Sequence, residues 1–280
     1  ACNRNVGGTC KTPWTLNLAN APSKAGKKVG IATRGYKGKK SNSMPYILDE
    51  TSDAQDYGDE AVYLSRHSNA IVCVCSQRLK AANLLFKRGV DVILSDDGLQ
   101  HFALKRDLEL VVVASDRAFG NRRLLPAGPL REGLDRLDTI DLICLNGKKI
   151  DEDLHLENTI GFEIENKTAK NIHNGQIRSI DAFINHDVNL IAGIGDPNVL
   201  IQKLIKLGIN INHIKVADHA AIDSSEIKNL QGTPLFLTPK DLVKYSKDDL
   251  PKETWELIPE MMIDQSQEQS MMNKIFEIIQ

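Results

Sequence analysis

The sequence predicts an α/β protein whose first half forms a mainly parallel β-sheet. Short apolar runs alternate there with amphipathic segments, which is the order that parallel βα units produce. Polar clusters follow directly after Thr33, Leu94 and Ala114, at the carboxyl ends of predicted strands, where ligands gather in open α/β sheets. A glycine-rich turn, Gly7-Gly8, also precedes Lys11 at the start of a predicted helix. Together these features predict a ligand site at one edge of the sheet.

The first half contains predicted helices separated by predicted strands. Each expected strand is a short apolar run, and each expected helix carries apolar residues on one face. Gly26 ends the first helix, and the polar residues 37–43 are expected to form an exposed loop. In chain order we expect a helix at 11–24, a strand at 29–33, a helix at 59–66, a strand at 70–74, a helix at 78–88, and strands at 90–94, 108–114 and 142–145.

The composition changes after Asn146-Gly147, where residues 148–187 become rich in Asn, Asp, Glu and Lys. We therefore expect a boundary near residue 155, with residues 1–155 as a first domain and 156–280 as a smaller C-terminal α/β domain. In the second part we expect strands near 161–164, 177–180, 189–194 and 234–237, and helices at 197–207, 240–245 and 267–279.

The composition restricts the class of protein. Of the 280 residues, 41% are apolar and 26% are charged, which is typical of a soluble globular protein. A net charge of −2 gives no electrostatic argument for a nucleic-acid partner. No apolar stretch approaches the ~18 residues of a membrane-spanning helix, and no signal peptide is visible. The five cysteines lack zinc-type spacing, which favours reduced thiols in a cytoplasmic setting.

The first thirteen residues carry an altered phosphate-loop pattern. A glycine-rich turn before Lys11-Thr12 lets backbone N–H groups surround phosphates, while Lys adds charge and Thr holds Mg²⁺. The strict pattern has glycine where this chain has Asn5 and Cys10, so the motif alone leaves nucleotide binding undecided. Because such a loop normally follows a strand, we expect an N-terminal piece to be missing.

The segment Ser95-Asp96-Asp97-Gly98-Leu99-Gln100-His101 is the strongest chemical signal. It follows a buried predicted strand, and its paired carboxylates suit a divalent ion that bridges nucleotide phosphates. The structural alternative is an ordinary Asp-Gly turn. Two adjacent acids in a chain that also has a phosphate-loop pattern favour the metal site.

Other candidates carry stronger structural alternatives. Gly58-Asp59-Glu60 is typical of a helix N-terminus, with Asp59 as the cap. Arg34, at a strand end, is a candidate phosphate ligand or a solvated charge. His219 follows Asp218 directly, so an acid partner for it has to come from elsewhere in the fold.

Residues 119–132 form a long loop between two predicted strands and mix Gly, Pro and Arg. Long loops of this kind are often functional, and the apolar Leu124-Leu125-Pro126 in this loop argues against disorder. We favour a shaped lid or substrate wall in which Arg123 and Arg131 bind anions. A rigid surface connection is the alternative.

Taken together, these segments resemble the tetraacyldisaccharide 4′-kinases (lipid A 4′-kinases). The resemblance runs from the first residues to about Asp241, and its two central motifs are long and specific. The matching segments are Cys2-Asn3, Val6-Gly7-Gly8-Thr9-Cys10-Lys11-Thr12-Pro13, Thr33-Arg34-Gly35-Tyr36, Gly58-Asp59-Glu60, residues 95–101, residues 119–132, Gly193-Ile194-Gly195-Asp196-Pro197 and Asp218-His219.

The resemblance implies a phosphate-loop NTPase-like fold of two α/β/α lobes, and it implies that the first strand and an N-terminal helix of the first domain are missing from this chain. It implies transfer of the γ-phosphoryl group of ATP, with Mg²⁺, to the 4′-hydroxyl of a tetraacyl glucosamine disaccharide 1-phosphate, the lipid A precursor. The expected place is the cytoplasmic face of the bacterial inner membrane, as a peripheral protein on the membrane surface; no protein partner and no nucleic acid is inferred.

The resemblance also implies roles for individual residues. Asp59, His219, Lys11 and Asp97 are the catalytic residues, with Asp59 and His219 as a dyad that activates the sugar hydroxyl. The nucleotide ligands are Val6, Gly7, Gly8, Thr9, Cys10, Lys11 and Thr12. The metal ligands are Thr12, Asp96, Asp97 and Glu60. The substrate ligands are Arg34, Asn121 and Arg131.

Cys10 stands where the family has glycine before the lysine, and Cys2 and Cys75 also replace family glycines. A Cβ next to the lysine restricts both the backbone and the approach of a phosphate. The main alternative is therefore an impaired remnant of the family with a degraded phosphate loop. Two others are a kinase or ligase for a small soluble metabolite and a nucleotide-dependent interaction switch.

Overall fold

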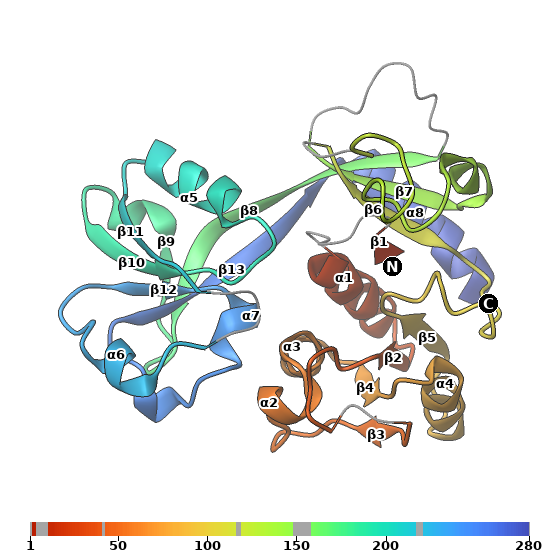
Figure 1. Ribbon diagram of the computed structural model, residues 1–280, viewed down its shortest axis with the longest axis horizontal. Helices are drawn as coiled ribbons and strands as arrows, with labels where there is room; N and C mark the ends of the chain where they lie inside the picture. Colours follow the sequence, from red (N-terminus) through yellow and green to blue (C-terminus); the bar gives the residue numbers. More distant parts are fainter. Residues whose placement is uncertain are drawn as a thin grey trace.

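Two lobes are joined by a pair of long antiparallel strands, β8 (Thr159–Asn171) and β13 (Thr254–Ile263) (Figure 1). The pairing changes register between Ile258 and Pro259, where proline removes a backbone donor from the ladder. The computed structural model describes residues 2–3, 11–40, 43–115, 119–147, 158–216 and 221–279.

A small, mostly parallel sheet lies in the first lobe in the order β3-β4-β2-β5. The central strand β2 is buried at every position and pairs in parallel with β4 and β5, whereas β3 is antiparallel to β4. The strands are β2 (Val29–Thr33), β3 (Tyr46–Ile47), β4 (Ile71–Val74) and β5 (Val92–Ser95). The helices of this part are α1 (Lys11–Lys24), α2 (Ala54–Tyr57), α3 (Asp59–His67) and α4 (Arg78–Lys87).

Helices cover both faces of this sheet. Ala19 of α1 and Leu64 of α3 pack with Ile31 on one face. Leu85 of α4 packs with Cys73 on the other. This burial of both faces explains why the strands are continuous apolar runs.

A second, larger sheet contains nine strands among the described residues and extends across both lobes. Its order is β1-β6-β7-β8-β13-β12-β10-β11, with β9 paired to β8, and most neighbours are parallel. The strands not yet given are β1 (Cys2–Asn3), β6 (Leu110–Ala114), β7 (Leu142–Asn146), β9 (Ile177–Ser179), β10 (Asp187–Ile191), β11 (Asn210–Ile214) and β12 (Leu235–Leu237).

The second lobe also has helices on both sheet faces. Leu200 and Leu204 of α5 pack with Phe236 on one face, and Ile227 of α6 packs with Leu237 on the other. The helices are α5 (Pro197–Lys206), α6 (Ser224–Lys228) and α7 (Pro239–Leu242). Short 3₁₀ helices span Leu134–Thr139, Ile180–Phe183 and Lys247–Asp249.

The last helix, α8 (Gln265–Ile279), returns to the first lobe (Figure 1). Its Met271 is 1% exposed and packs in one cluster with Trp14 of α1 and Phe162 of β8. The Trp14 and Phe162 rings meet edge to face at 5.1 Å. The domain boundary near residue 155 lies outside the described residues and stays a prediction.

The predicted α/β class with mostly parallel strands is confirmed, and several elements keep their predicted bounds, including the helix at 11–24 and the strand at 29–33. The strand predicted at 161–164 is part of the longer β8, and β11 and β13 were not predicted. Two residues of β1 pair in parallel with β6 ahead of the loop, where the sequence predicts no strand.

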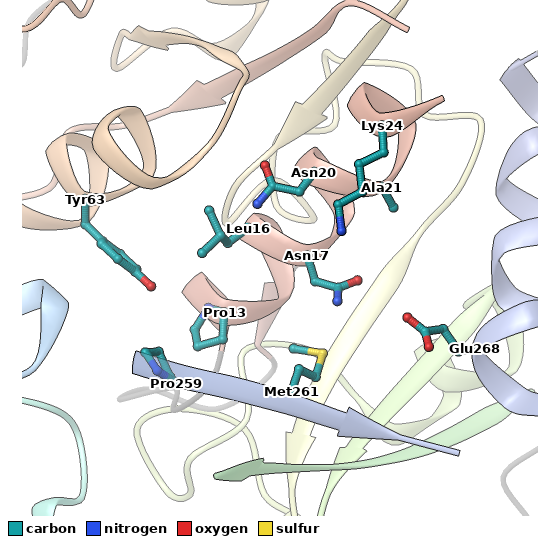
Figure 2. A pocket seen from close by; sticks show the side chains of 10 residues that line it. All are labelled: Pro13, Leu16, Asn17, Asn20, Ala21, Lys24, Tyr63, Pro259, Met261 and Glu268. Atoms are coloured by element: carbon teal, nitrogen blue, oxygen red, sulfur yellow. The ribbon is translucent and has the colours of Figure 1, made fainter. Parts of the chain in front are cut away.

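A cavity of about 390 Å³ lies between α1, α3, β13 and α8 (Figure 2). Its lining includes Asn17 and Asn20 of α1, Tyr63 of α3, Met261 of β13 and Glu268 of α8. None of the predicted site residues that the structure describes lines this cavity. Within the described ranges, no helix has the length and apolar character needed to cross a membrane.

Replacing Met271 by alanine should destabilise the protein by about 2–5 kcal/mol, because the substitution leaves a cavity between α8 and the first lobe. The matched change Ile278→Ala, at a side chain 43% exposed on the same helix, should cost less than about 0.5 kcal/mol. Urea unfolding measures both. Equal losses would show that α8 does not depend on the buried contact.

Candidate active site

Lys11 begins α1, and its ammonium group lies 3.0 Å from Oδ1 of Asp97. Burial by itself lowers the pKa of Lys11, but the charges of Asp97, Asp96 and Glu60 outweigh that effect and raise the pKa above its usual value. The side chain is only 14% exposed. Lys11 therefore stays cationic in a largely buried place, as a phosphate-binding lysine must.

Asp96 follows β5 and is 6% exposed. The hydroxyl group of Thr15 donates to its Oδ1 at 3.3 Å, and that of Thr33 lies 3.5 Å from its Oδ2. Arg78, itself buried, donates from Nη2 to the main-chain carbonyl of Asp96 at 3.0 Å. Hydrogen bonds from three side chains thus fix both the backbone and the carboxylate of this acid.

Asp97 has a φ of 51°, a left-handed conformation that is uncommon for a residue other than glycine. Its carboxylate forms an ion pair with the ammonium group of Lys11 and lies 3.2 Å from Nη1 of Arg131. Such backbone strain is concentrated at functional sites. The next residue, Gly98, has no room for a Cβ because Ser95 occupies that space.

The loop at residues 119–132 is fastened to this acidic segment. Arg131 contacts Oε1 of Gln100 at 3.4 Å, and Gln100 donates to Oε1 of Glu132 at 2.6 Å. Leu130 is fully buried beside Leu99 in the core below. The loop therefore stands as a fixed wall next to Asp97, and its role toward a substrate stays a prediction.

The other predicted substrate ligands differ in position. The side chain of Asn121 donates to the carbonyl of Ala127 at 2.8 Å and accepts from the N–H of Arg123 at 3.1 Å, so it shapes its own loop. Arg34 directly follows β2, and its side chain is exposed. Burial lowers the pKa of His101, and the positive charges of nearby arginines, including Arg34, lower it further.

Asp59 and Glu60 begin α3 after Gly58, which has a φ of +88°. A Cβ at Gly58 would lie 2.6 Å from the carbonyl oxygen of Tyr36. The close packing of these two segments explains why glycine is needed here. Asp59 is 5% exposed and accepts from the N–H of Glu60 at 2.8 Å.

Two lysines of the second lobe contact these acids. Nζ of Lys240 lies 3.4 Å from Oε1 of Glu60 and 3.9 Å from Oδ2 of Asp59, and Nζ of Lys244 lies 3.8 Å from the same Asp59 oxygen. Burial raises the pKa of Glu60, and Asp96 adds to the rise while Lys240 opposes it. The two acids of α3 therefore lie where both lobes meet.

Part of the predicted site lies outside the described residues. This is true of Val6, Gly7, Gly8, Thr9 and Cys10 in the phosphate loop. It is also true of Asp218 and His219. Thr12 is described as a half-buried residue in the first turn of α1, next to Lys11.

Sequence reasoning missed several residues of the site. Thr15 lies four positions after Lys11, so helical spacing puts both on one face of α1 and was an available signal. Lys240 and Lys244 are also four positions apart, within the predicted helix at 240–245, so the same signal was available for them. For Arg78, whose guanidinium lies beneath Asp96, the sequence offered no comparable signal.

The acids suit a magnesium–nucleotide ligand. Among the described residues, no three His, Cys, Asp or Glu side chains group to form a metal site by themselves. Mg²⁺ at nucleotide sites needs only one or two carboxylates, because phosphates and waters complete its shell. The carboxylates of Asp96 and Asp97 are hard oxygen donors of the kind that Mg²⁺ prefers, and the charge of Asp96 contributes to the raised pKa of Glu60.

A largely buried lysine at a helix start, in direct contact with one acid of an adjacent pair at the end of a strand, defines a phosphate-loop phosphotransferase. The comparisons with known proteins agree. The model of the Tetraacyldisaccharide-1-P 4′-kinase family matches residues 2–277. This chain belongs to that family.

Individual relatives support the assignment. The tetraacyldisaccharide 4′-kinase of Aliivibrio fischeri strain MJ11 is 36% identical over 280 residues, covering 99% of this chain and 82% of that protein. The corresponding protein of Colwellia psychrerythraea is 40% identical over 263 residues, covering 92% and 76%. A crystal structure of LpxK from Aquifex aeolicus in complex with ATP superposes with a TM-score of 0.80 at 25% identity, covering 100% of this chain and 87% of that one.

Replacing Gly58 by alanine should destabilise the protein more than the same change at Gly26. Both glycines have positive φ, but a Cβ at Gly26 meets nothing within 4 Å. Gly26→Ala should therefore cost about 1–2 kcal/mol from backbone strain alone. Gly58→Ala should cost about 1–3 kcal/mol more, because the Tyr36 backbone has to move. Unfolding free energies test this, and equal costs would contradict the packing argument.

Proposed function

We propose that this chain transfers the γ-phosphoryl group of ATP to the 4′-hydroxyl of a tetraacyl glucosamine disaccharide 1-phosphate, a step of lipid A biosynthesis. One observation carries the proposal. Lys11 from the loop-and-helix segment and Arg131 from the 119–132 loop both contact the carboxylate of Asp97. Three segments that resemble this family's motifs thus meet at one side chain.

Phosphoryl transfer needs mainly alignment and neutralisation of charge. Lys11 is placed to bind the phosphates, with residues 6–10 and Thr12 as further nucleotide ligands. Asp96, Asp97, Glu60 and Thr12 would hold Mg²⁺, which supplies charge neutralisation at the phosphate oxygens when bound. The buried, hydrogen-bonded Asp96 keeps its carboxylate fixed for this role.

Activation of the sugar hydroxyl is assigned to Asp59 and His219. A hydroxyl nucleophile needs a proton acceptor, and a histidine oriented by a carboxylate is suited to that role. The described residues on either side of residues 217–220 support the assignment. Val216 and Ile222 lie in one apolar cluster with Tyr245, whose hydroxyl accepts from the N–H of Ile222 at 3.0 Å.

Tyr245 directly follows Lys244, one of the two lysines that contact Asp59. Val216 and Ile222, the described residues on either side of His219, are therefore anchored beside the part of the second lobe that contacts the predicted dyad partner.

Arg34, Asn121 and Arg131 are proposed as substrate ligands, with the two arginines suited to anionic groups of the disaccharide phosphate. The contact of Arg131 with Asp97 supports its assignment. Because the acceptor is a lipid, we propose that the protein works at the cytoplasmic face of the inner membrane as a peripheral protein.

The dyad assignment predicts non-additive losses. Asp59→Ala and His219→Ala should each lower kcat by roughly 10²–10⁴-fold, the usual contribution of acid–base catalysis. The double variant should lose little more than the worse single variant, because either change disables the same proton acceptor. Steady-state kinetics with ATP and the lipid acceptor measure all three. Independent, multiplying losses would reject the dyad.

A transfer assay with labelled ATP tests the proposed function and the impaired-remnant alternative together. The acceptor is a tetraacyl disaccharide 1-phosphate, and the chain is compared with its Cys10→Gly variant. We expect label transfer by the chain, and faster transfer after Cys10→Gly because glycine permits closer backbone approach to phosphate. Transfer only by the variant would favour the remnant. Absence of transfer by both would overturn the proposed function.

A further inference from the structure

The lobes meet through a small network of buried charges at α3 and α7. Asp59 at the start of α3 is 5% exposed, and Lys244 just after α7 has a side chain 6% exposed. Their ionic groups lie 3.8 Å apart. A buried carboxylate is costly unless it is paired, so this cation is part of what permits Asp59 to occupy its position.

Lys244 is itself anchored within the second lobe. Its Nζ donates to Oδ1 of Asp241 at 2.7 Å, and Asp241 is fully buried. The other carboxylate oxygen of Asp241 accepts from the N–H of Gly193 at 2.8 Å and from the hydroxyl of Thr238 at 2.6 Å. The ammonium group is therefore attached to a rigid set of hydrogen bonds and is not a mobile surface charge.

Gly193 makes room for this arrangement. A Cβ at this position would lie 2.7 Å from Oδ1 of Asp241 and 3.3 Å from Nζ of Lys244. Gly193 is the first residue of the 193–197 motif, to which the proposed chemistry gives no role. The structure gives it one, since a side chain here would push apart the pair that reaches toward Asp59.

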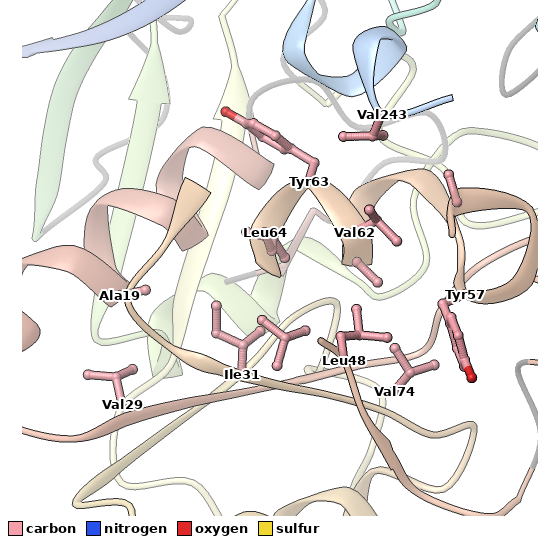
Figure 3. Close-up of a cluster of buried hydrophobic side chains, with 13 residues drawn as sticks. Ala19, Val29, Ile31, Leu48, Tyr57, Val62, Tyr63, Leu64, Val74 and Val243 are labelled. Carbon is pink, nitrogen blue, oxygen red and sulfur yellow. The ribbon is translucent and has the colours of Figure 1, made fainter. Parts of the chain in front are cut away.

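Apolar packing holds the same contact together. Val243, next to Lys244, is 4% exposed and belongs to the core cluster of the first lobe. Figure 3 shows it over Val62 and Tyr63 of α3. The ion pair and the apolar contact thus join α7 to α3 at the end of α3 that carries Asp59.

We propose that Lys244 is a positioning residue, held by Asp241 in the space left by Gly193, that fixes the Asp59 carboxylate of the other lobe for phosphoryl transfer. The inference rests on the proposed function. It assigns to the 193–197 motif a mechanical role, in which the second lobe sets the position of an acid of the first lobe without touching the nucleotide.

Kinetics of matched variants test the proposal. Lys244→Met and Gly193→Ala should each lower kcat roughly 10- to 100-fold, the scale expected when a catalytic group is misplaced by about 1 Å. KM for ATP should stay within about twofold, because Lys11 and the phosphate loop are untouched. Lys244→Arg should recover most of the kcat, since a guanidinium can still pair with both acids.

The controls are Lys203→Met and Gly161→Ala. Lys203 donates to the carbonyl of Ile164 in the bridging strand β8, and a Cβ at Gly161 meets nothing within 4 Å. Both should keep the wild-type kcat. Amide hydrogen exchange of α3 and α7 should become faster in Lys244→Met but not in Lys203→Met, which checks the lobe contact without an activity measurement.

The outcomes separate the two proposals. A wild-type chain that transfers no phosphate overturns the proposed function and the positioning role with it. An active wild type with an unchanged kcat in Lys244→Met overturns only the inference, as does a parallel rise in KM for ATP. If Lys244→Met does not fold, Gly193→Ala decides the question, because it displaces the same ammonium group without deleting it. A wild-type kcat in Gly193→Ala would then overturn the inference.

Discussion

The ion pair between Lys11 and Asp97 is the interaction around which the site is arranged. Four acids, Asp59, Glu60, Asp96 and Asp97, are brought to one region by α3 and by the end of β5. Acids this close together repel one another, so the fold has to supply cations from other segments. Lys11 comes from the start of α1. The other cations come from a loop of the first lobe and from the second lobe. This balance of charge fixes how those segments meet.

Close contacts at three glycines support the arrangement. Gly58 lies against the Tyr36 carbonyl, and Gly98 against Ser95, so neither position can carry a side chain without displacing a neighbour. Gly193 has the same property at the lobe contact. Glycines in three separate motifs therefore each leave room for a neighbour, which is backbone at Gly58 and side chains at Gly98 and Gly193.

The bridge between the lobes explains how a two-lobed chain keeps such geometry. β8 and β13 continue one sheet from the first lobe into the second, and α8 then packs under Trp14 beside α1. The second lobe is consequently held at two places, through the strands and through the contact of α7 with α3. Catalysis by alignment requires this, because a phosphoryl donor and its acceptor gain most when their relative position is fixed.

The sequence by itself determined the α/β class, most first-half elements and the segments that carry chemistry, because apolar periodicity and glycine-containing motifs are local signals. It predicted Lys11, Asp96 and Asp97 as site residues, and the resemblance added Asp59; the structure brings Lys11 and Asp97 into contact. It did not predict β13 or the full length of β8, whose pairing joins residues about 90 positions apart and depends on partners that no local pattern reveals. Only the tertiary structure decided that Lys240 and Lys244 face the acids of α3, since contacts between lobes are set by packing and charge in three dimensions.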